Sequence, residues 1–404
     1  MEKKNEGKKS SKILNKKKER EKTTKNTKLS PDKHKEDSIN FYDVETFNIE
    51  FKSNPEKNMN YQKMNVDNWD NNNHLLNTLI SFKSFDNILY LIYSNNTPSI
   101  ICHDIINNKK IIEIKKAHKY HISDFKHYLD KKNNRDLLIS ISDWIYNIKI
   151  WNINNWECLY NFKDDTYGDN YTYSADFLID NNNIFIIIGR SNIFYTEIIT
   201  PEDEIRVYDL KGEKIKEIKN SNKVTSNIST YYDNQLNKIY IIGADRKFIN
   251  SYDYYENQLY NKYGCCDDND PNIDDDENSL YIFNYCSLSI FRINQKKDLV
   301  ELIYLDQFSN INIWNFHSRE LLGKFNLNKI LIYDICLWNN EYMFIGCTDN
   351  TIKLIELENY KIVKTLNGHN DYVKNINKII HPKYGECLLS QGILNDEIFL
   401  WSPS

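Results

Sequence analysis

The stretch that decides the fold is residues 368–401, GHNDYVKNINKIIHPKYGECLLSQGILNDEIFLW, close to the end of the chain. It begins with a Gly-His pair and continues with three runs typical of β-strands, at 372–380, 387–391 and 397–401. A single sheet of this kind leaves two apolar faces uncovered, so it is stable only if the chain repeats it and stacks the copies. We therefore expect the rest of the chain to contain further copies.

Six other stretches end as this one does, with an aromatic or apolar residue followed by a polar one. With Trp401, these anchor residues are His103, Trp151, Tyr208, Tyr252, Trp314 and Ile355. Successive anchors are 48, 57, 44, 62, 41 and 46 residues apart, close to or above the repeat length of about 40–45 residues in propeller blades. Another strand-like run follows each of the first six anchors, at 110–115, 157–162, 214–218, 258–263, 320–325 and 361–366. Seven anchors predict an all-β, seven-bladed β-propeller of four-stranded antiparallel blades over residues 75–404.

The order of residues in 368–401 resembles one blade of a WD-repeat β-propeller. The matching residues are His369, Ser390, Asp396 and Trp401 in the last blade, and His118, Ser140, Asp143 and Trp151 in the second. The resemblance implies that these residues, together with Trp314, are structural, since in that family the His, Ser, Asp and Trp share buried hydrogen bonds. The segments at 314–322, 335–357 and 381–392 also resemble a group of WD-repeat proteins from unicellular eukaryotes, which implies no particular activity.

The last blade has no candidate for its fourth strand, because the sequence ends at Ser404, three residues after Trp401. Residues 47–52 alternate strictly between apolar and polar side chains, which is typical of a half-buried strand. We expect this N-terminal strand to pair with the last blade and close the ring, within a segment 39–74 that links back to the first full blade. The alternative closing strand is 62–66.

Charge divides the chain into a basic arm and an acidic body. The chain has 52 basic and 57 acidic residues. Residues 1–35 contain 14 of the basic and five of the acidic residues, a net charge of +9. The remaining 38 basic and 52 acidic residues give the rest of the chain a net charge of −14. Residues 1–38 contain almost no apolar side chains, so we expect a disordered Lys-rich tail. A nuclear import signal, or a contact with nucleic acid or acidic lipid, is the alternative to a simple solvated tail.

The cysteines favour a reducing, intracellular compartment. Eight are present, at 102, 158, 265, 266, 286, 336, 347 and 387, without any C-x-x-C spacing, and most lie within apolar strand patterns. No signal peptide and no apolar run long enough to span a bilayer are present. We expect a location in the cytoplasm, with the nucleus as the alternative, and a monomeric propeller within a complex.

No sequence motif indicates catalysis. Phosphate-binding loops, the H-E-x-x-H metal motif and the G-x-S-x-G nucleophile motif are all missing. His118 and His369 could resemble parts of a hydrolase triad, but a buried turn without a cleft favours a structural role. Cys265, Cys266 and the acidic run 267–277 could bind a cation, although the spacing favours a solvated loop. We therefore expect a protein that is not an enzyme and has no metal or cofactor.

Binding to other proteins fits the sequence best. Turns between propeller strands converge at the ends of the channel, where polar and aromatic residues form a composite surface. The candidate binding residues near those turns are Tyr120, Trp144, Asp349, Asp371, Tyr372 and Asn395. We expect a non-catalytic scaffold or receptor for peptide segments of other proteins. The alternative is a nuclear or nucleic-acid-associated protein that uses its basic tail.

Overall fold

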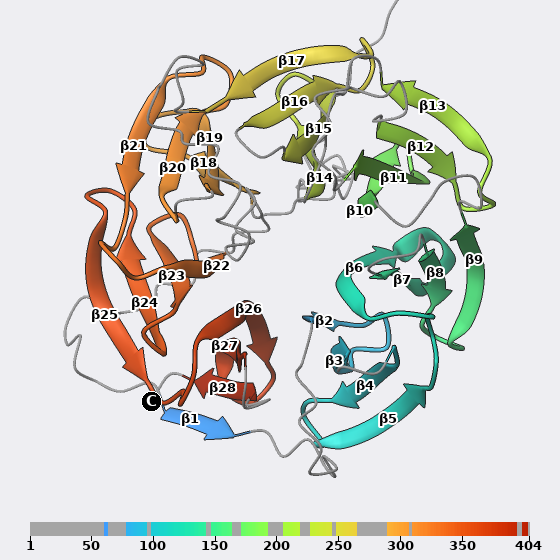
Figure 1. Cartoon of the computed structure of the whole chain (residues 1–404), viewed down its shortest axis with the longest axis horizontal. Helices are drawn as coiled ribbons and strands as arrows, with labels where there is room; N and C mark the ends of the chain where they lie inside the picture. The colour runs from blue at the N-terminus through green and yellow to red at the C-terminus, as the bar shows by residue number, and fades with distance from the viewer. Residues whose placement is uncertain are drawn as a thin grey trace, which may run out of the picture. The chain divides into compact units, whose positions relative to one another are not determined.

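The computed structural model describes residues 60–63, 78–94, 98–142, 147–163, 171–192, 205–218, 227–244, 248–264, 289–306, 309–393 and 398–402. All of these lie within Phe41–Ser404, one of the two units into which the chain divides. They form seven antiparallel sheets of four strands, arranged in a ring (Figure 1). This confirms the all-β, seven-bladed β-propeller that the seven anchors predict.

Blades 1 to 6 each use four consecutive strands, numbered from the innermost to the outermost. Blade 1 contains β2 (Thr78–Lys83), β3 (Leu89–Ser94), β4 (Ile100–Asp104) and β5 (Lys109–Ile114), and blade 2 contains β6 (Ile122–Asp130), β7 (Arg135–Ser142), β8 (Asn147–Asn152) and β9 (Glu157–Lys163). Blade 3 contains β10 (Tyr171–Asp180), β11 (Asn183–Asn192), β12 (Ile205–Asp209) and β13 (Lys214–Ile218), and blade 4 contains β14 (Ile228–Asp233), β15 (Lys238–Ala244), β16 (Ile249–Asp253) and β17 (Gln258–Tyr263). Blade 5 contains β18 (Ser289–Asn294), β19 (Leu299–Leu305), β20 (Ile311–Asn315) and β21 (Leu321–Phe325), and blade 6 contains β22 (Ile332–Leu337), β23 (Tyr342–Cys347), β24 (Thr351–Glu356) and β25 (Lys361–Asn367).

Each anchor is the last but one residue of the third strand in its blade. In blades 1 to 6 the register between the third and fourth strands shifts directly before the anchor, for example between Ile150 and Trp151 and between Ile313 and Trp314. Such a bulge adds twist and turns the anchor side chain. The six outer strands lie within one residue of their predicted bounds, because the same alternating pattern defines them in every blade.

Seven clusters of buried apolar side chains hold the blades together, one at each interface between neighbouring blades. The cluster between blades 7 and 1 joins Leu389 and Leu400 to Leu89 and Leu91. The first and last full blades are therefore packed against each other, and the ring of apolar interfaces is continuous. Each sheet therefore covers the apolar faces of its two neighbours, which a single blade would leave exposed.

Blade 7 consists of β26 (Val373–His381), β27 (Gly385–Gly392), β28 (Ile398–Ser402) and, at its outer edge, β1 (Asn60–Lys63). Strand β1 pairs antiparallel with β28 (Figure 1), with Asn60 opposite Ser402 and Lys63 opposite Phe399. It overlaps the alternative strand 62–66, whereas the favoured strand 47–52 lies outside the described residues. Closure of the ring by the N-terminal region stays a prediction.

Helices contribute almost nothing to the part of the chain that the structure describes. It contains one short 3-10 helix, η1 (Lys131–Asn133), and no helix there has the length and apolar character needed to cross a membrane. The two longest spacings between anchors, 57 and 62 residues, predict insertions at 189–201 and 264–278, and most of these residues lie outside the described ranges. The tail 1–38 and the acidic run 267–277 also lie outside them.

Candidate interaction surface

A bulge in the innermost strand of blade 6 presents a tyrosine that the sequence patterns do not single out. In β22, Ile332 lies opposite Cys347 and Asp334 lies opposite Gly346, so Tyr333 is an extra residue without a cross-strand partner. A bulge of this kind redirects its side chain out of the regular alternation of the strand. Alternation alone therefore did not predict the direction of Tyr333.

The ring of Tyr333 stacks on that of Tyr372, which comes from the loop before β26 in blade 7. The two ring centroids are 6.3 Å apart and the rings are inclined by 24°. Tyr372 remains 42% exposed, and Tyr333 is partly buried. The pair forms a half-exposed aromatic surface at the interface between blades 6 and 7.

Asp371 places a carboxylate beside this pair. Its side chain is buried and accepts a hydrogen bond from the backbone N–H of Tyr372 at 2.7 Å. Burial raises the pKa of Tyr333, and the nearby Tyr372 and Asp371 raise it further. Of these neighbours only the Asp371 carboxylate is charged at neutral pH, and this negative charge suits a cation at the pair better than an anion.

The end of blade 7 that carries these residues packs tightly on blade 6. A methyl group added at Gly346 would stand 2.8 Å from the backbone carbonyl oxygen of Val373. Only glycine allows the two backbones this approach. The position of Tyr372 relative to Tyr333 thus depends on a close contact between neighbouring blades.

Two other predicted binding residues, Asp349 and Tyr120, contact different side chains. Asp349, in the turn between β23 and β24, accepts from the Thr351 hydroxyl at 2.6 Å and pairs with Lys353 at 2.6 Å. Burial opposes its ionisation, but the hydrogen bonds from Lys353 and Thr351 hold the pKa of Asp349 below its usual value. Tyr120 lies in blade 2, with the Lys119 ammonium 5.1 Å from its ring centroid. Trp144 and Asn395 lie outside the described residues.

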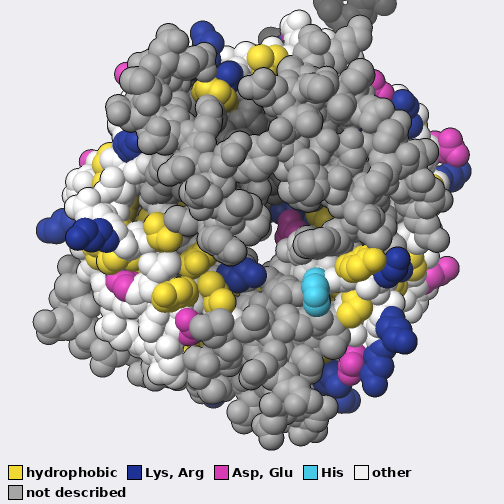
Figure 2. Space-filling view, viewed as in Figure 1, with side chains coloured by type: hydrophobic (Ala, Val, Ile, Leu, Met, Phe, Trp, Pro, Cys, Tyr) yellow, Lys and Arg dark blue, Asp and Glu magenta, His cyan; other side chains and the backbone are white. Residues whose placement is uncertain are grey.

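Charged residues on the innermost strands form a second polar group. Asp124 and Lys126 of β6 are 3.0 Å apart and keep 40% and 26% of their side chains exposed. Figure 2 shows a hollow at the centre of the ring, with acidic and basic side chains at its wall. Burial lowers the pKa of Lys126, but the carboxylates of Asp124, Asp176 and Asp334 outweigh it, and the net shift is upward. Because these carboxylates come from blades 2, 3 and 6, Lys126 interacts with charges around the ring.

Two of these carboxylates have strongly raised pKa values. Burial raises the pKa of Asp334 to about 7 and that of Asp176 to about 6, and Lys126 offsets only part of the effect. Each accepts a hydrogen bond from the N–H of the next residue, as Asp124 does, at 2.8 Å. These hydrogen bonds favour the ionised carboxylates, but burial outweighs them at Asp334 and Asp176.

His118 and His369, the histidines of the predicted blade motif, occupy buried positions. Ser140 accepts from the Trp151 indole N–H at 2.8 Å and lies 2.6 Å from His118 Nε2. Ser390 repeats this arrangement, 2.7 Å from the Trp401 indole and 2.6 Å from His369 Nε2. Burial lowers the pKa of His118 to about 3, and Lys149 adds to the effect, so this histidine is neutral at physiological pH. Asp143 and Asp396 lie outside the described residues. Trp314 is partly buried and packs against the aromatic cluster between blades 4 and 5.

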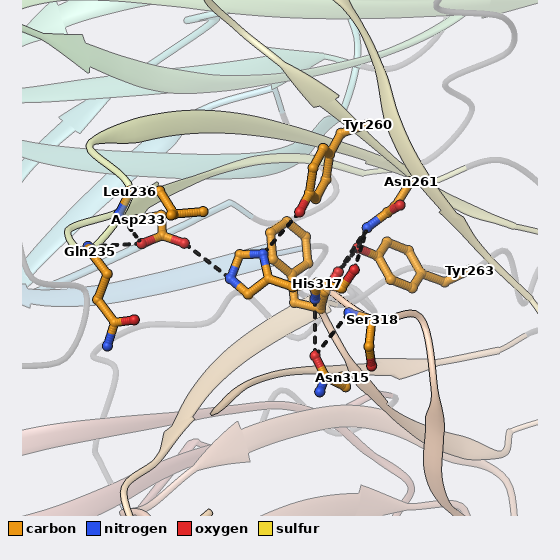
Figure 3. A network of polar contacts seen from close by, with 10 residues as sticks. Asp233, Gln235, Leu236, Tyr260, Asn261, Tyr263, Asn315, His317 and Ser318 are labelled. Atoms are coloured by element: carbon orange, nitrogen blue, oxygen red, sulfur yellow. Dashed lines mark hydrogen bonds and ion pairs between the residues drawn. The ribbon is translucent and has the colours of Figure 1, made fainter. Parts of the chain in front are cut away.

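A histidine not considered in the sequence analysis connects blades 4 and 5 (Figure 3). His317, in the turn between β20 and β21, has its Nε2 3.1 Å from the Asp233 carboxylate and its Nδ1 3.1 Å from the Tyr260 hydroxyl. Asp233 also accepts from the backbone N–H groups of Gln235 and Leu236. Asp233 is the last residue of the innermost strand β14, and Tyr260 belongs to the outermost strand β17, so His317 of blade 5 contacts both ends of the blade 4 sheet.

No group of three or more His, Cys, Asp or Glu side chains suited to a metal ion occurs among the described residues. Cys265, Cys266 and the acidic run 267–277 lie outside the described residues.

In comparisons with models of known protein families and with curated proteins, the chain matches none. The fold therefore assigns the chain to the seven-bladed β-propellers as a structural class, and that class often serves as an interaction scaffold.

Proposed function

We propose that this chain is a WD-repeat-type propeller that acts as a non-catalytic scaffold or receptor and binds peptide segments of other proteins. The stacked pair of Tyr333 and half-exposed Tyr372 carries the proposal, because exposed aromatic side chains held by neighbouring structure are typical centres of protein interfaces. We assign peptide binding to the surface formed by this pair and Asp371, with Tyr120 in blade 2 and Asp349 in blade 6 as further contributors.

The serine–histidine contacts support a role without catalysis. Ser140 and Ser390 are each engaged by a tryptophan and a histidine, and both serines are buried. A nucleophile needs access to its substrate and a base that can take up its proton. His118 is buried away from any substrate, and its lowered pKa makes it a weak base.

Recovery of the tagged full-length protein from its own cells tests the proposal. We expect a set of co-purifying proteins that is lost with Tyr372→Ala and retained with Tyr255→Ala. Tyr255 is a matched control because it is 46% exposed and its hydroxyl bonds to Asp180 elsewhere on the molecule. Identical protein sets for the wild type and Tyr372→Ala would contradict the assignment of this surface.

The basic tail supports the second candidate function, a nuclear or nucleic-acid-associated protein. Residues 1–35 carry nine positive charges in excess, whereas the rest of the chain is acidic. We expect any retention on nucleic acid to fall steeply with salt and to disappear when residues 1–38 are deleted. If the protein without its tail retains the same partner proteins, the scaffold function is favoured. A location in the cytoplasm and not in the nucleus would also favour the scaffold function.

A further inference from the structure

The same bulge occurs in three blades with three different side chains. Residues in the position of Tyr333 are Ser123 in β6 and Lys374 in β26, each skipped by the pairing with the second strand. Blade 6 alone among these has an aromatic side chain there. Of these three bulges, only the one in blade 6 therefore carries an aromatic ring, at the interface with blade 7.

Lysines of this chain already occupy the faces of several aromatic rings. The ammonium of Lys119 lies 5.1 Å from the ring centroid of Tyr120, that of Lys216 lies 4.3 Å from Tyr254, and that of Lys378 lies 4.8 Å from Trp338. Among the described residues, no lysine or arginine takes this place on Tyr333 or Tyr372. The exposed ring of Tyr372 is therefore available for a cation from outside the chain.

One nearby charge favours such a cation. Asp371 is buried next to the pair, and its carboxylate acts on the Tyr333 hydroxyl. Tyr333 packs against the Tyr372 ring and limits its motion, so the ring is oriented before a partner arrives. A planar guanidinium stacks on an aromatic face and keeps its N–H groups free for hydrogen bonds, which an ammonium cannot do equally well.

We propose that the Tyr333–Tyr372 pair binds an arginine side chain of a partner peptide, with Tyr372 as the contacting ring, Tyr333 as the positioning residue and Asp371 as the nearby negative charge. This inference rests on the proposed function and adds the chemistry of the partner.

The test uses acetylated, amidated octapeptide pools whose central residue is fixed as arginine, citrulline, leucine or glutamate. Citrulline has the shape of arginine without its charge. We expect the full-length protein to bind the arginine pool about three- to fivefold more tightly than the citrulline pool in fluorescence anisotropy, as a cation on an exposed ring allows. Tyr372→Ala should abolish this ratio, and Tyr255→Ala should preserve it.

Three further variants separate positioning from simple loss of structure. We expect Tyr333→Phe to keep the arginine-to-citrulline ratio, because a phenyl ring stacks as well, and Tyr333→Ser, which introduces the residue of blade 2, to remove it. Asp371→Asn should reduce binding of the arginine pool about twofold and leave the citrulline pool unchanged. Melting curves of all variants should overlap with the wild type, which excludes unfolding as the cause.

The outcomes distinguish this inference from the proposed function. Equal binding of the arginine and citrulline pools, or tighter binding of the leucine or glutamate pool, overturns the arginine assignment. If Tyr372→Ala then still weakens the binding of every pool, peptide binding at this surface stands. An arginine preference that survives Tyr372→Ala overturns the site itself.

Discussion

The carboxylate of Asp334, on the innermost strand of blade 6, accepts a hydrogen bond from the backbone N–H of Ile376 in blade 7 at 2.7 Å. Its other oxygen accepts from the N–H of Ile335 at 2.8 Å. One buried side chain therefore joins two blades at the centre of the ring. The residue at the same register position in blade 7 is Asn375, which donates to Gln391 within its own blade.

This arrangement predicts that Asp334 contributes stability that grows as the pH falls from 8 to 5.5, while His118, with its lowered pKa, acts in the opposite direction. Burial raises the folded-state pKa of Asp334 to about 7 from an ordinary value of 3.8, so the folded protein binds the proton more tightly than the unfolded chain. The resulting stability is complete below the unfolded pKa and is lost as the pH rises through about 7. At roughly 1.4 kcal/mol per pKa unit, the contribution is on the order of 2–4 kcal/mol.

Thermal unfolding at several pH values measures this effect. We expect the change in melting temperature from pH 8 to pH 5.5 to be less favourable in Asp334→Asn than in the wild type. Asp349→Asn is the matched control, because the pKa of Asp349 lies below its usual value and its carboxylate therefore stays ionised between pH 8 and pH 5.5. An Asp334→Asn variant with the full pH dependence of the wild type would show that another group, such as Asp176, is responsible.

Ser390→Ala should destabilise the protein by about 2–3 kcal/mol. The substitution removes two buried hydrogen-bond contacts and leaves the Trp401 indole N–H without its acceptor. Ser140→Ala should have a similar effect, since Ser140 makes the same contacts in blade 2. Denaturant unfolding measures both, with Ser318→Ala on the exposed surface as the control. A cost below 0.5 kcal/mol, which is about the noise of a surface substitution, would refute the structural role.

Gly346→Ala should separate blades 6 and 7 and cost about 1–3 kcal/mol. The new methyl group would stand 2.8 Å from the Val373 carbonyl oxygen, which belongs to the backbone and cannot turn aside. Gly392→Ala is the matched control, because its methyl group would meet His369 Nδ1 at 3.5 Å, an ordinary contact. Equal melting temperatures for the two variants would contradict the close approach of the blades.

His317→Ala should weaken the interface between blades 4 and 5 by about 1–2 kcal/mol. The change removes the contacts of His317 with Asp233 and Tyr260 (Figure 3). Amide hydrogen exchange should become faster in β14–β17 and β20–β21 and remain unchanged in blade 7. Uniformly faster exchange around the ring would indicate that the network stabilises the whole propeller instead of one interface.

Two truncations identify the strand that closes blade 7. Deletion of residues 1–53 removes the predicted strand 47–52 and keeps Asn60–Lys63, which pairs with β28. Deletion of residues 1–66 removes both. We expect a large loss of melting temperature only with the longer deletion, because an unpaired β28 exposes a sheet edge. A large loss already with the shorter deletion would assign closure to 47–52.

The sequence alone determined the number of blades, the place of each third strand and most bounds of the outer strands. These features follow from alternation of apolar and polar residues and from the repeated anchors, such as Trp151 and Trp401, and both are local properties of the chain. The contacts of Ser140 and Ser390 follow from motif positions within a single blade. Sequence reasoning could also place Tyr372 near the end of a blade.

Only the tertiary structure decided which residues from different blades meet. Tyr333 faces Tyr372 because a bulge in β22 turns it out of the alternating pattern, and Asp334 reaches Ile376 because neighbouring inner strands converge. The partners of His317, which come from blade 4, are likewise set by packing. The physical reason is that periodicity specifies a strand and its faces, whereas contacts between blades depend on how whole sheets stack around the ring.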